Sequence, residues 1–308
     1  MEAWLTAIRF VHFAAVIVAF GQFAYAAVVS PDGRLPPRFG AVVGWSLALA
    51  VVTGLAWLAI EAGNMSGLPV LDALHADTVP IVLGQTQFGH VWCARAVFAA
   101  LVAASLAVLR FGGPGWSRAA RAAGAGAALL LLAALAGAGH AAADSGVDRL
   151  AHLGADAAHL VAAGAWLGTL LPFAALLRSC AASGTAESLA IASRASLRFS
   201  ALGQACVGVL VLTGLVNACY MIPSVAALFG SRYGADLLVK LGLVAVMVLV
   251  AAFNRVSLVP KIASAQRTAG TRAASALARN AAIEMALGIA IVAVVAQLGI
   301  TMPPMAVH

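Results

Sequence analysis

The chain has 308 residues, of which 63% are hydrophobic and only 9% are charged, and its net charge is +7. Soluble domains carry roughly 25% charged residues, so this composition excludes an ordinary water-soluble protein. The excess of basic residues follows the membrane topology described below, and it indicates no nucleic-acid partner.

Eight apolar stretches are long enough to cross a lipid bilayer, which requires about 20 residues each. The sequence therefore predicts an all-α polytopic membrane protein with transmembrane helices near 4–29, 39–61, 90–110, 119–139, 153–177, 199–221, 235–254 and 280–301. The first stretch also resembles a signal peptide, because Ala24, Tyr25 and Ala26 read like a cleavage site. We retain it as a mature helix, since Glu2 stands where a signal peptide has basic residues.

The basic residues indicate how the helices are oriented. Most of them follow the first, third, fifth and seventh stretches, as Arg34, Arg118 and Arg194 do. Cytoplasmic loops of inner-membrane proteins are enriched in Lys and Arg, so these loops are expected inside the cell. We therefore predict a multi-pass protein of the bacterial inner (plasma) membrane with both termini in the periplasm.

Three basic residues lie inside the outer parts of the stretches: Arg9, Arg95 and Lys240. Long basic side chains near the ends of membrane helices usually extend to the lipid headgroups, and we expect these three to do so. Lys240 can also pair with Asp236, four residues before it on the same helix face. Glu284 is deeper. It is expected to pair with a basic residue of the inner surface or to act as an exit ligand for a metal.

All seven histidines map to the outer half of the stretches or to the outer loops: His12, His75, His90, His140, His152, His159 and His308. The outer side also holds most of the acidic residues and several methionines, including Met302 and Met305. Imidazole and thioether groups suit a soft ion such as Cu(I) better than Mg or Ca, which prefer oxygen ligands. The sequence therefore predicts copper binding in the periplasmic half.

Some of these residues are more informative than others. His152, Asp156 and His159 are spaced i, i+4 and i+7, so they share one helix face, where a carboxylate can bind a metal or orient an imidazole. His12 and His159 lie well inside their helices, where polar groups are costly and usually functional. The predicted metal ligands are His12, His159, His152, Asp156, His140, His90, His75, Met302 and Met305. Taken singly, the histidines near helix ends also fit ordinary interfacial polar groups, and the tail methionines fit ordinary apolar residues.

The two halves of the chain repeat each other. His12 precedes Gly21 by nine residues, and His159 precedes Gly168 by nine. Further pairs recur in the same order at equal spacing: Thr53-Gly54 with Thr213-Gly214, and Phe88-Gly89 before Arg95 with Tyr233-Gly234 before Lys240. We therefore predict a single membrane domain, 1–308, built as a four-plus-four tandem repeat of residues 1–140 and 141–308. Parallel repeats are related by an axis along the membrane normal, and we expect His12 and His159 to face each other across it.

A set of short motifs occurs along the chain in a fixed order: Arg9-Phe-Val-His12, Asp156-Ala-Ala-His159, Trp166-Leu-Gly168, Arg198-Phe-Ser200, Thr213-Gly214, Tyr233-Gly234 with Lys240, Asn254-Arg255 and Glu284. By these motifs the chain resembles the copper-resistance D (CopD) family over nearly its whole length. The resemblance implies a role in copper homeostasis or resistance, in which copper moves inward. It also implies a separate periplasmic copper-binding protein as a partner.

Three functions remain open at this point. The leading hypothesis is a copper permease with an inner route through Cys206, Met247, Met285 and Glu284. The second is a haem b electron-transfer protein in which His12 and His159 are axial ligands, with Gly21 and Gly168 making room for the porphyrin. The third is a copper receptor or assembly factor that does not transport.

The sequence holds no nucleotide-binding motif and no nucleophile–base pair. We therefore expect neither direct ATP drive nor an enzyme.

Overall fold

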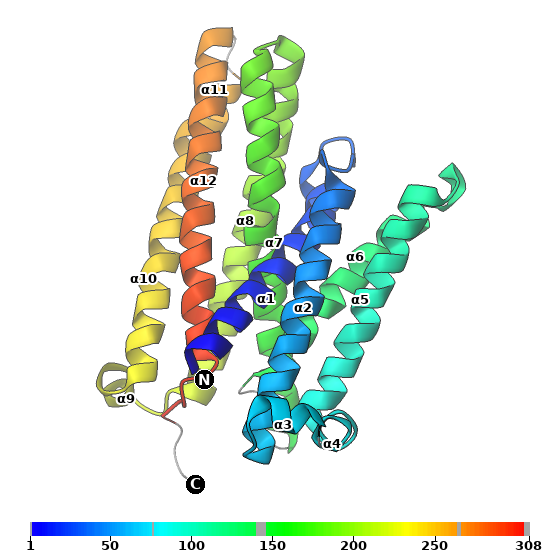
Figure 1. Cartoon of the computed structure of the whole chain (residues 1–308). Coiled ribbons are helices and arrows are strands. Elements are labelled where there is room, and N and C mark those ends of the chain that lie inside the picture. Colours follow the sequence, from blue (N-terminus) through cyan, green and yellow to red (C-terminus); the bar gives the residue numbers. More distant parts are fainter. Residues whose placement is uncertain (1, 76, 140–145, 264–265, 305–308) are drawn as a thin grey trace.

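The computed structural model describes residues 2–75, 77–139, 146–263 and 266–304 (Figure 1). Over these ranges the chain forms helices joined by turns, without a strand. Eight of the helical segments are long and apolar enough to cross a membrane, in the predicted order. The expected all-α polytopic class is confirmed.

The membrane helices belong to two groups of four. The first group is α1 (Glu2–Ala24, continued by a π-helical turn Tyr25–Val29), α2 (Phe39–Ser66), α5 (Gln87–Phe111) and α6 (Ser117–Ala133, continued by a 3-10 turn Ala134–Ala138). The second group is α7 (Gly146–Ser183), α8 (Ala186–Met221), α10 (Arg232–Phe253, continued by a π-helical turn Asn254–Leu258 and α11, Val259–Ile262) and α12 (Arg267–Leu298).

Short helices gather at one end of the bundle. They are α3 (Val70–His75), α4 (Thr78–Gln85) and α9 (Val225–Gly230). The start of α1 and the end of α12 lie at this same end (Figure 1). The sequence left the segment 63–89 without an assigned structure, and α3 and α4 form most of it, packed on α2 and α5. That this end faces the periplasm stays a prediction.

The second group is longer than predicted. Helices α8 and α12 begin at Ala186 and Arg267, more than a turn before the apolar stretches that start near 199 and 280. At the end away from the termini, the second group extends beyond the first (Figure 1). The apolar pattern marks only the part of a helix that lipid requires. Ala- and Arg-rich segments also form helices readily in water, so a search for apolar stretches does not detect them.

Each group forms an apolar core, and each core also includes residues of the other group. The first core is built around Val16, Trp57 and Leu132, and the second around Leu170 and Met247. The groups meet where α1, α7 and α12 pack on one another. The division of the chain into two four-helix halves and their relation as a tandem repeat both stay predictions.

The backbones of the two halves come into contact where α1 crosses α7 at two glycines. A Cβ atom added to Gly21 would lie 2.1 Å from the carbonyl carbon of Gly168. A Cβ added to Gly168 would lie 2.3 Å from the backbone oxygen of Ile17. Small residues let membrane helices pack backbone to backbone, and these two positions have no room for any side chain. The expectation that Gly21 and Gly168 make space for a porphyrin was therefore wrong, because the backbone of the other helix occupies the space next to each glycine.

Helices α5 and α10 begin in the same way. The Thr86 hydroxyl accepts a hydrogen bond from the Gly89 backbone N–H at 3.0 Å, and Ser231 accepts one from Gly234 at 3.0 Å. Such N-caps satisfy N–H groups that the first helical turn leaves open. The two glycines also allow the preceding short helix to pack close, because a Cβ at either would lie 2.0 Å from a backbone oxygen. The same local construction thus precedes Arg95 in one half and Lys240 in the other.

Candidate functional site

His12 lies in the core of the first half, with only 3% of its surface exposed. Its Nδ1 atom is 2.9 Å from the hydroxyl oxygen of Thr53 on α2. That hydroxyl donates its own hydrogen to the carbonyl oxygen of Leu49 at 2.7 Å, so it accepts from the imidazole. The hydrogen therefore sits on Nδ1 of His12, and Nε2 carries the lone pair.

The Nε2 atom of His12 faces a cation. The guanidinium group of Arg95, from α5, contacts it directly. Arg95 and Arg9 are each 5% exposed, and their guanidinium carbons lie 5.6 and 4.6 Å from the ring of Trp57. Cations at such distances from an indole face are stabilised by the ring quadrupole. The expectation that both arginines extend to the lipid headgroups was wrong, because both are enclosed by the bundle.

His159 is surrounded in the same way in the second half. Its Nδ1 atom is 3.0 Å from the hydroxyl oxygen of Thr213 on α8, and that hydroxyl donates to Val209 at 2.7 Å. Its Nε2 atom is 3.5 Å from the ammonium nitrogen of Lys240 on α10. We call these groups cluster 1 (His12, Thr53, Arg95) and cluster 2 (His159, Thr213, Lys240).

The glycine that follows each threonine has the same position in both clusters. A Cβ added to Gly54 would lie 3.5 Å from Cε1 of His12, and one added to Gly214 would lie 3.6 Å from Cε1 of His159. In each matched Thr-Gly pair, the threonine hydroxyl thus lies next to Nδ1 of the histidine, and the glycine backbone lies against the edge of the imidazole ring. In both halves the imidazole is oriented by the second helix and capped by a cation from the third.

The two imidazoles do not form one shared site in this structure. Both ring nitrogens of His12 face groups of the first half, and both nitrogens of His159 face groups of the second. Neither ring therefore presents a nitrogen to the other, contrary to the expectation that they face each other. Over the described ranges, no three His, Cys, Asp or Glu side chains are arranged to hold one ion.

The stripe residues His152, Asp156 and His159 of α7 contact side chains of α8 and α10, and copper binding by them stays a prediction. Asp156 accepts a hydrogen bond from the side-chain amide of Asn217 at 3.3 Å and also interacts electrostatically with Lys240. The imidazole of His159 is oriented by Thr213. His152 is 2% exposed and stacks on the ring of Tyr220, with centroids 4.5 Å apart, so it is no surface group.

The remaining predicted ligands lie at the end that holds the short helices. His75 donates from Nδ1 to the carbonyl oxygen of Leu71 at 2.7 Å, and His90 donates from Nε2 to that of Gly84 at 3.1 Å. Each ring therefore keeps a lone pair on its other nitrogen. Met302 is 87% exposed. Two further predicted ligands, His140 and Met305, lie outside the described residues.

Sequence reasoning missed the partners of the two deep histidines. The two threonines, Thr53 and Thr213, were used only as evidence for the repeat. The two cations, Arg95 and Lys240, were expected at the lipid headgroups. The available signal was that the threonines and cations recur with the histidines, at the same spacing, in both halves. A structural repeat alone requires no such matched polar set inside a membrane, where polar groups are costly.

Comparison with known proteins identifies the family of the chain. Residues 1–151 match the family described as copper resistance protein D-like, N-terminal domain, and residues 193–298 match copper resistance protein D. The chain is 30% identical over 94% of its length to copper resistance protein D of Pseudomonas syringae pv. tomato, and the match covers 92% of that protein. The chain belongs to the copper resistance protein D family.

A second relative supports the predicted location. The chain is 32% identical to inner membrane protein YebZ of Escherichia coli (strain K12), over 98% of both proteins. With its eight apolar helices, the chain is a multi-pass inner-membrane protein. No solved structure matches it. The predicted family is confirmed, and copper handling is the role that the family name supports.

Proposed function

We propose that the chain binds copper in the periplasmic half of its membrane domain and carries it across the inner membrane. The observation that carries this proposal is the matched orientation of two imidazoles. In clusters 1 and 2, a threonine fixes the hydrogen on Nδ1, and the Nε2 lone pair faces a positive charge. Metal-ligating histidines are held in this manner, with the non-ligating nitrogen donating to a nearby oxygen.

The cations of the two clusters stand where a metal ion would bind. Arg95 and Lys240 contact the same Nε2 atoms that would ligate copper. An arriving copper ion and the side-chain cation repel each other, so the cation must withdraw when copper binds. The clusters therefore fit copper as a passing cargo better than as a resident ion, because withdrawal of the cation is reversible.

Ligands at the surface provide a place for capture. His75, His90 and Met302 are exposed and offer imidazole and thioether groups, which suit copper. A separate periplasmic copper-binding protein would deliver the ion to these residues.

The inward route runs through the second half. Cys206 and Met247 are buried in its core, with Met285 packed against that core. A buried thiol and two thioethers are soft ligands for an ion that leaves cluster 2. The first core holds no cysteine or methionine among its described members.

The first test is the copper content and visible spectrum of the purified protein, compared with His12→Ala, His159→Ala and the double variant. With two separate clusters, each single variant should lose part of the bound copper and the double variant should lose what remains in the membrane interior. Loss of all copper in either single variant would indicate one shared site. Proteins that bind no copper, or that show a Soret band lost in the same variants, would contradict the proposal.

A measurement of copper flux distinguishes a permease from a receptor that only binds copper. Purified protein reconstituted in proteoliposomes should accumulate copper faster than liposomes that hold the double variant His12→Ala, His159→Ala. Binding without any flux in the wild type would leave a copper receptor or assembly factor, and transport would be withdrawn.

The threonines give a second prediction. Thr53→Val or Thr213→Val removes the acceptor on Nδ1 with little change of shape, so the imidazole loses its fixed tautomer. Loss of such an outer-shell partner typically weakens metal affinity about 10–100-fold. A titration against a competing Cu(I) chelator measures this. Thr185→Val, at the helix turn on the opposite end, serves as the control and should leave the copper affinity unchanged.

A further inference from the structure

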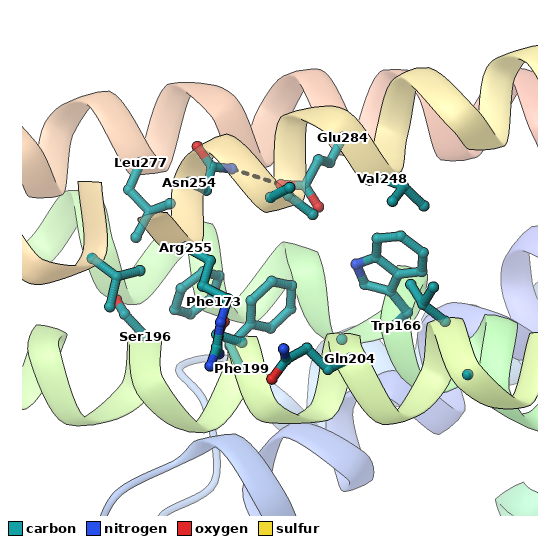
Figure 2. Close-up of a pocket in the computed structure, with 17 residues that line it drawn as sticks. Trp166, Phe173, Ser196, Phe199, Gln204, Val248, Asn254, Arg255, Leu277 and Glu284 are labelled. Atoms are coloured by element: carbon teal, nitrogen blue, oxygen red, sulfur yellow. Dashed lines mark hydrogen bonds between the residues drawn. The ribbon is translucent and has the colours of Figure 1, made fainter. Parts of the chain in front are cut away.

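Two cavities lie toward the end of the bundle that is away from the short helices. Cavity 1, in the first half, has a volume of about 530 Å³ and lies between the start of α2 and the end of α5. Cavity 2, in the second half, has a volume of about 430 Å³ and lies between α8 and the end of α10, with residues of α7 and α12 in its wall (Figure 2). Pockets for small ligands measure roughly 300–1,000 Å³, so each cavity has room for a ligand. The proposed copper binding in clusters 1 and 2 uses neither of them.

The two cavities occupy matching positions in the two halves. Phe39 lines cavity 1 and Phe199 lines cavity 2, and each stands fourteen residues before the threonine of its cluster. Arg110 and Arg255 also line these cavities, and each stands fifteen residues after the cation of its cluster. Two helices of each half thus bring an aromatic ring and a guanidinium group to the same place. An arginine that served only to mark the cytoplasmic end of a helix would not need to line a cavity, so this recurrence indicates a function.

Both cavities open at the outer face of the bundle, where lipid surrounds it. Helices α8 and α10 touch each other at few points. Gly208 of α8 and Ala252 of α10 line cavity 2 and are exposed, so the cavity opens between these two helices. Cavity 1 opens in the same manner between α2 and α5, where Gly40 and Ala107 are exposed lining residues. An opening between membrane-spanning helices meets acyl chains rather than water.

The walls behind these openings are mainly apolar. In cavity 1 they consist of leucine, alanine, glycine and phenylalanine residues besides Arg110. In cavity 2 the rings of Trp166, Phe173 and Phe199 form part of the wall. Such walls suit a hydrocarbon chain and offer few contacts to a small polar molecule.

Glu284 also lines cavity 2, but its partners are neutral. Asn254 donates a hydrogen bond to its Oε1 atom at 2.8 Å, and the indole nitrogen of Trp166 is turned toward the same carboxyl group (Figure 2). No ion pair within 4.0 Å joins Glu284 to a base of the described residues. The expected pairing of Glu284 with a basic residue is therefore replaced by a pairing with neutral donors. The positive charge of Arg255 is not neutralised by it.

Each cavity carries one guanidinium group on the side away from its copper cluster. Arg255 donates to the hydroxyl of Ser200 on α8 at 2.8 Å, and Figure 2 shows it extending from the π-helical turn toward α8. Arg110 is exposed, and its guanidinium carbon lies 5.5 Å from the centre of the Phe111 ring. Neither arginine forms an ion pair within 4.0 Å with a carboxylate of the described residues. A guanidinium group has five N–H donors in a planar fork that matches a phosphate group, so both arginines have donors left for one.

The position of the arginines indicates which molecule supplies the phosphate. In the predicted orientation this end of the bundle faces the cytoplasm, so both guanidinium groups stand near the lipid headgroups of the inner leaflet. Basic pockets between membrane helices on that side bind the headgroups of anionic lipids. A soluble phosphate compound would contact the arginine but leave the apolar wall uncovered, whereas a phospholipid supplies both a phosphate and an acyl chain.

We propose that cavities 1 and 2 each bind one anionic phospholipid of the inner leaflet, with its phosphate on Arg110 or Arg255 and part of an acyl chain in the cavity. A lipid with a net negative charge is preferred, because the ammonium group of a zwitterionic headgroup repels the same arginine. Each cavity lies between the helix that carries the threonine of a cluster and the helix that carries its cation. The bound lipid therefore fixes the spacing of these two helices. Its effect on copper rests on the proposed function, whereas lipid binding does not.

The test is native mass spectrometry of the full-length, copper-free protein in detergent, titrated with phosphatidylglycerol or with phosphatidylethanolamine of the same acyl chains. The wild type should retain two molecules of phosphatidylglycerol, at a lower lipid concentration than phosphatidylethanolamine requires. Arg110→Gln and Arg255→Gln should each lose one of the two, and the double variant should lose both. Arg272→Gln, which removes an exposed arginine that lines neither cavity, is the control and should retain two.

Filling the cavities tests the place of the acyl chain. Gly40 lines cavity 1 and Gly208 lines cavity 2, and a Cβ at either would meet nothing within 4 Å. Leucine therefore fits at both positions, favours the helix over glycine and occupies the space of the chain. Gly40→Leu and Gly208→Leu should each lose one lipid while remaining folded. Gly242→Leu on α10 has the same free space, lines neither cavity and should retain both lipids.

Three results would overturn the proposal. The first is equal retention of the two lipids, and the second is retention of two phosphatidylglycerol molecules by the double arginine variant or by both leucine variants. The third is full competition by glycerol 3-phosphate, which would identify a soluble phosphate compound as the ligand. Because the assay contains no copper, its failure leaves the copper tests of clusters 1 and 2 unaffected.

Discussion

Gly168→Val is expected to destabilise the protein strongly, although it leaves the polar groups of the protein intact. A Cβ at this position would lie 2.3 Å from the backbone oxygen of Ile17 and 2.8 Å from the Cα atom of Gly21. Backbone atoms cannot move aside as flexible side chains do, so α1 and α7 must separate. Overpacking typically costs about 1–3 kcal/mol, and the contact with backbone on both sides places this substitution at or above the upper value.

The measurement is thermal unfolding of the purified protein in detergent, followed by tryptophan fluorescence. Gly154→Val is the matched control, because it lies on the same helix and a Cβ there would meet nothing within 4 Å. The control should unfold near the wild-type temperature, while Gly168→Val should unfold well below it or fail to accumulate. Equal melting temperatures for the two variants would show that the halves are not joined at this crossing.

Lys240→Leu is expected to strengthen copper binding at cluster 2. The ammonium nitrogen lies 3.5 Å from Nε2 of His159, close to where a bound copper ion would stand. Two unit charges about 4 Å apart near a protein surface interact by about 4 kcal/mol, which corresponds to roughly a thousandfold in affinity. Lysine is flexible and lowers this repulsion by withdrawing, so a gain between about tenfold and a thousandfold is expected.

A competition titration with a Cu(I) chelator measures the change, and leucine is chosen because it supplies no ligand atom. Lys261→Leu removes an exposed lysine at the opposite end of the bundle and should leave copper affinity unchanged. Weaker binding in Lys240→Leu would mean that the lysine holds the imidazole for copper. The cation would then be a positioning group rather than a competitor.

Prediction from sequence succeeded where the physical requirement is local. The number and order of the membrane helices follow from apolar length, because lipid cannot satisfy exposed backbone groups and each crossing must be a complete apolar helix. The helix ends were less accurate. Helices α8 and α12 begin well before their apolar stretches, since water tolerates the continued helix and the hydrophobic pattern does not record it.

The deep polar residues show the limit of this reasoning. His12, Arg95 and Glu284 are all buried, but position along a helix does not tell which way a side chain turns. From its position along the helix, Arg95 was expected to extend to the lipid headgroups. It points into the bundle instead and contacts His12. Glu284 finds Asn254, a residue thirty positions away, through a π-helical turn that no local pattern predicts.

By itself, therefore, the sequence determined the class of protein, its family, the order of its helices and the two histidines that lie deep within them. Only the tertiary structure decided that these histidines occupy separate clusters, each with a threonine and a cation of its own half. The physical reason is that the rotation of a helix about its axis depends on what it packs against. The close crossing of Gly21 and Gly168 sets this rotation for α1 and α7, and it depends on residues that are far apart in the chain.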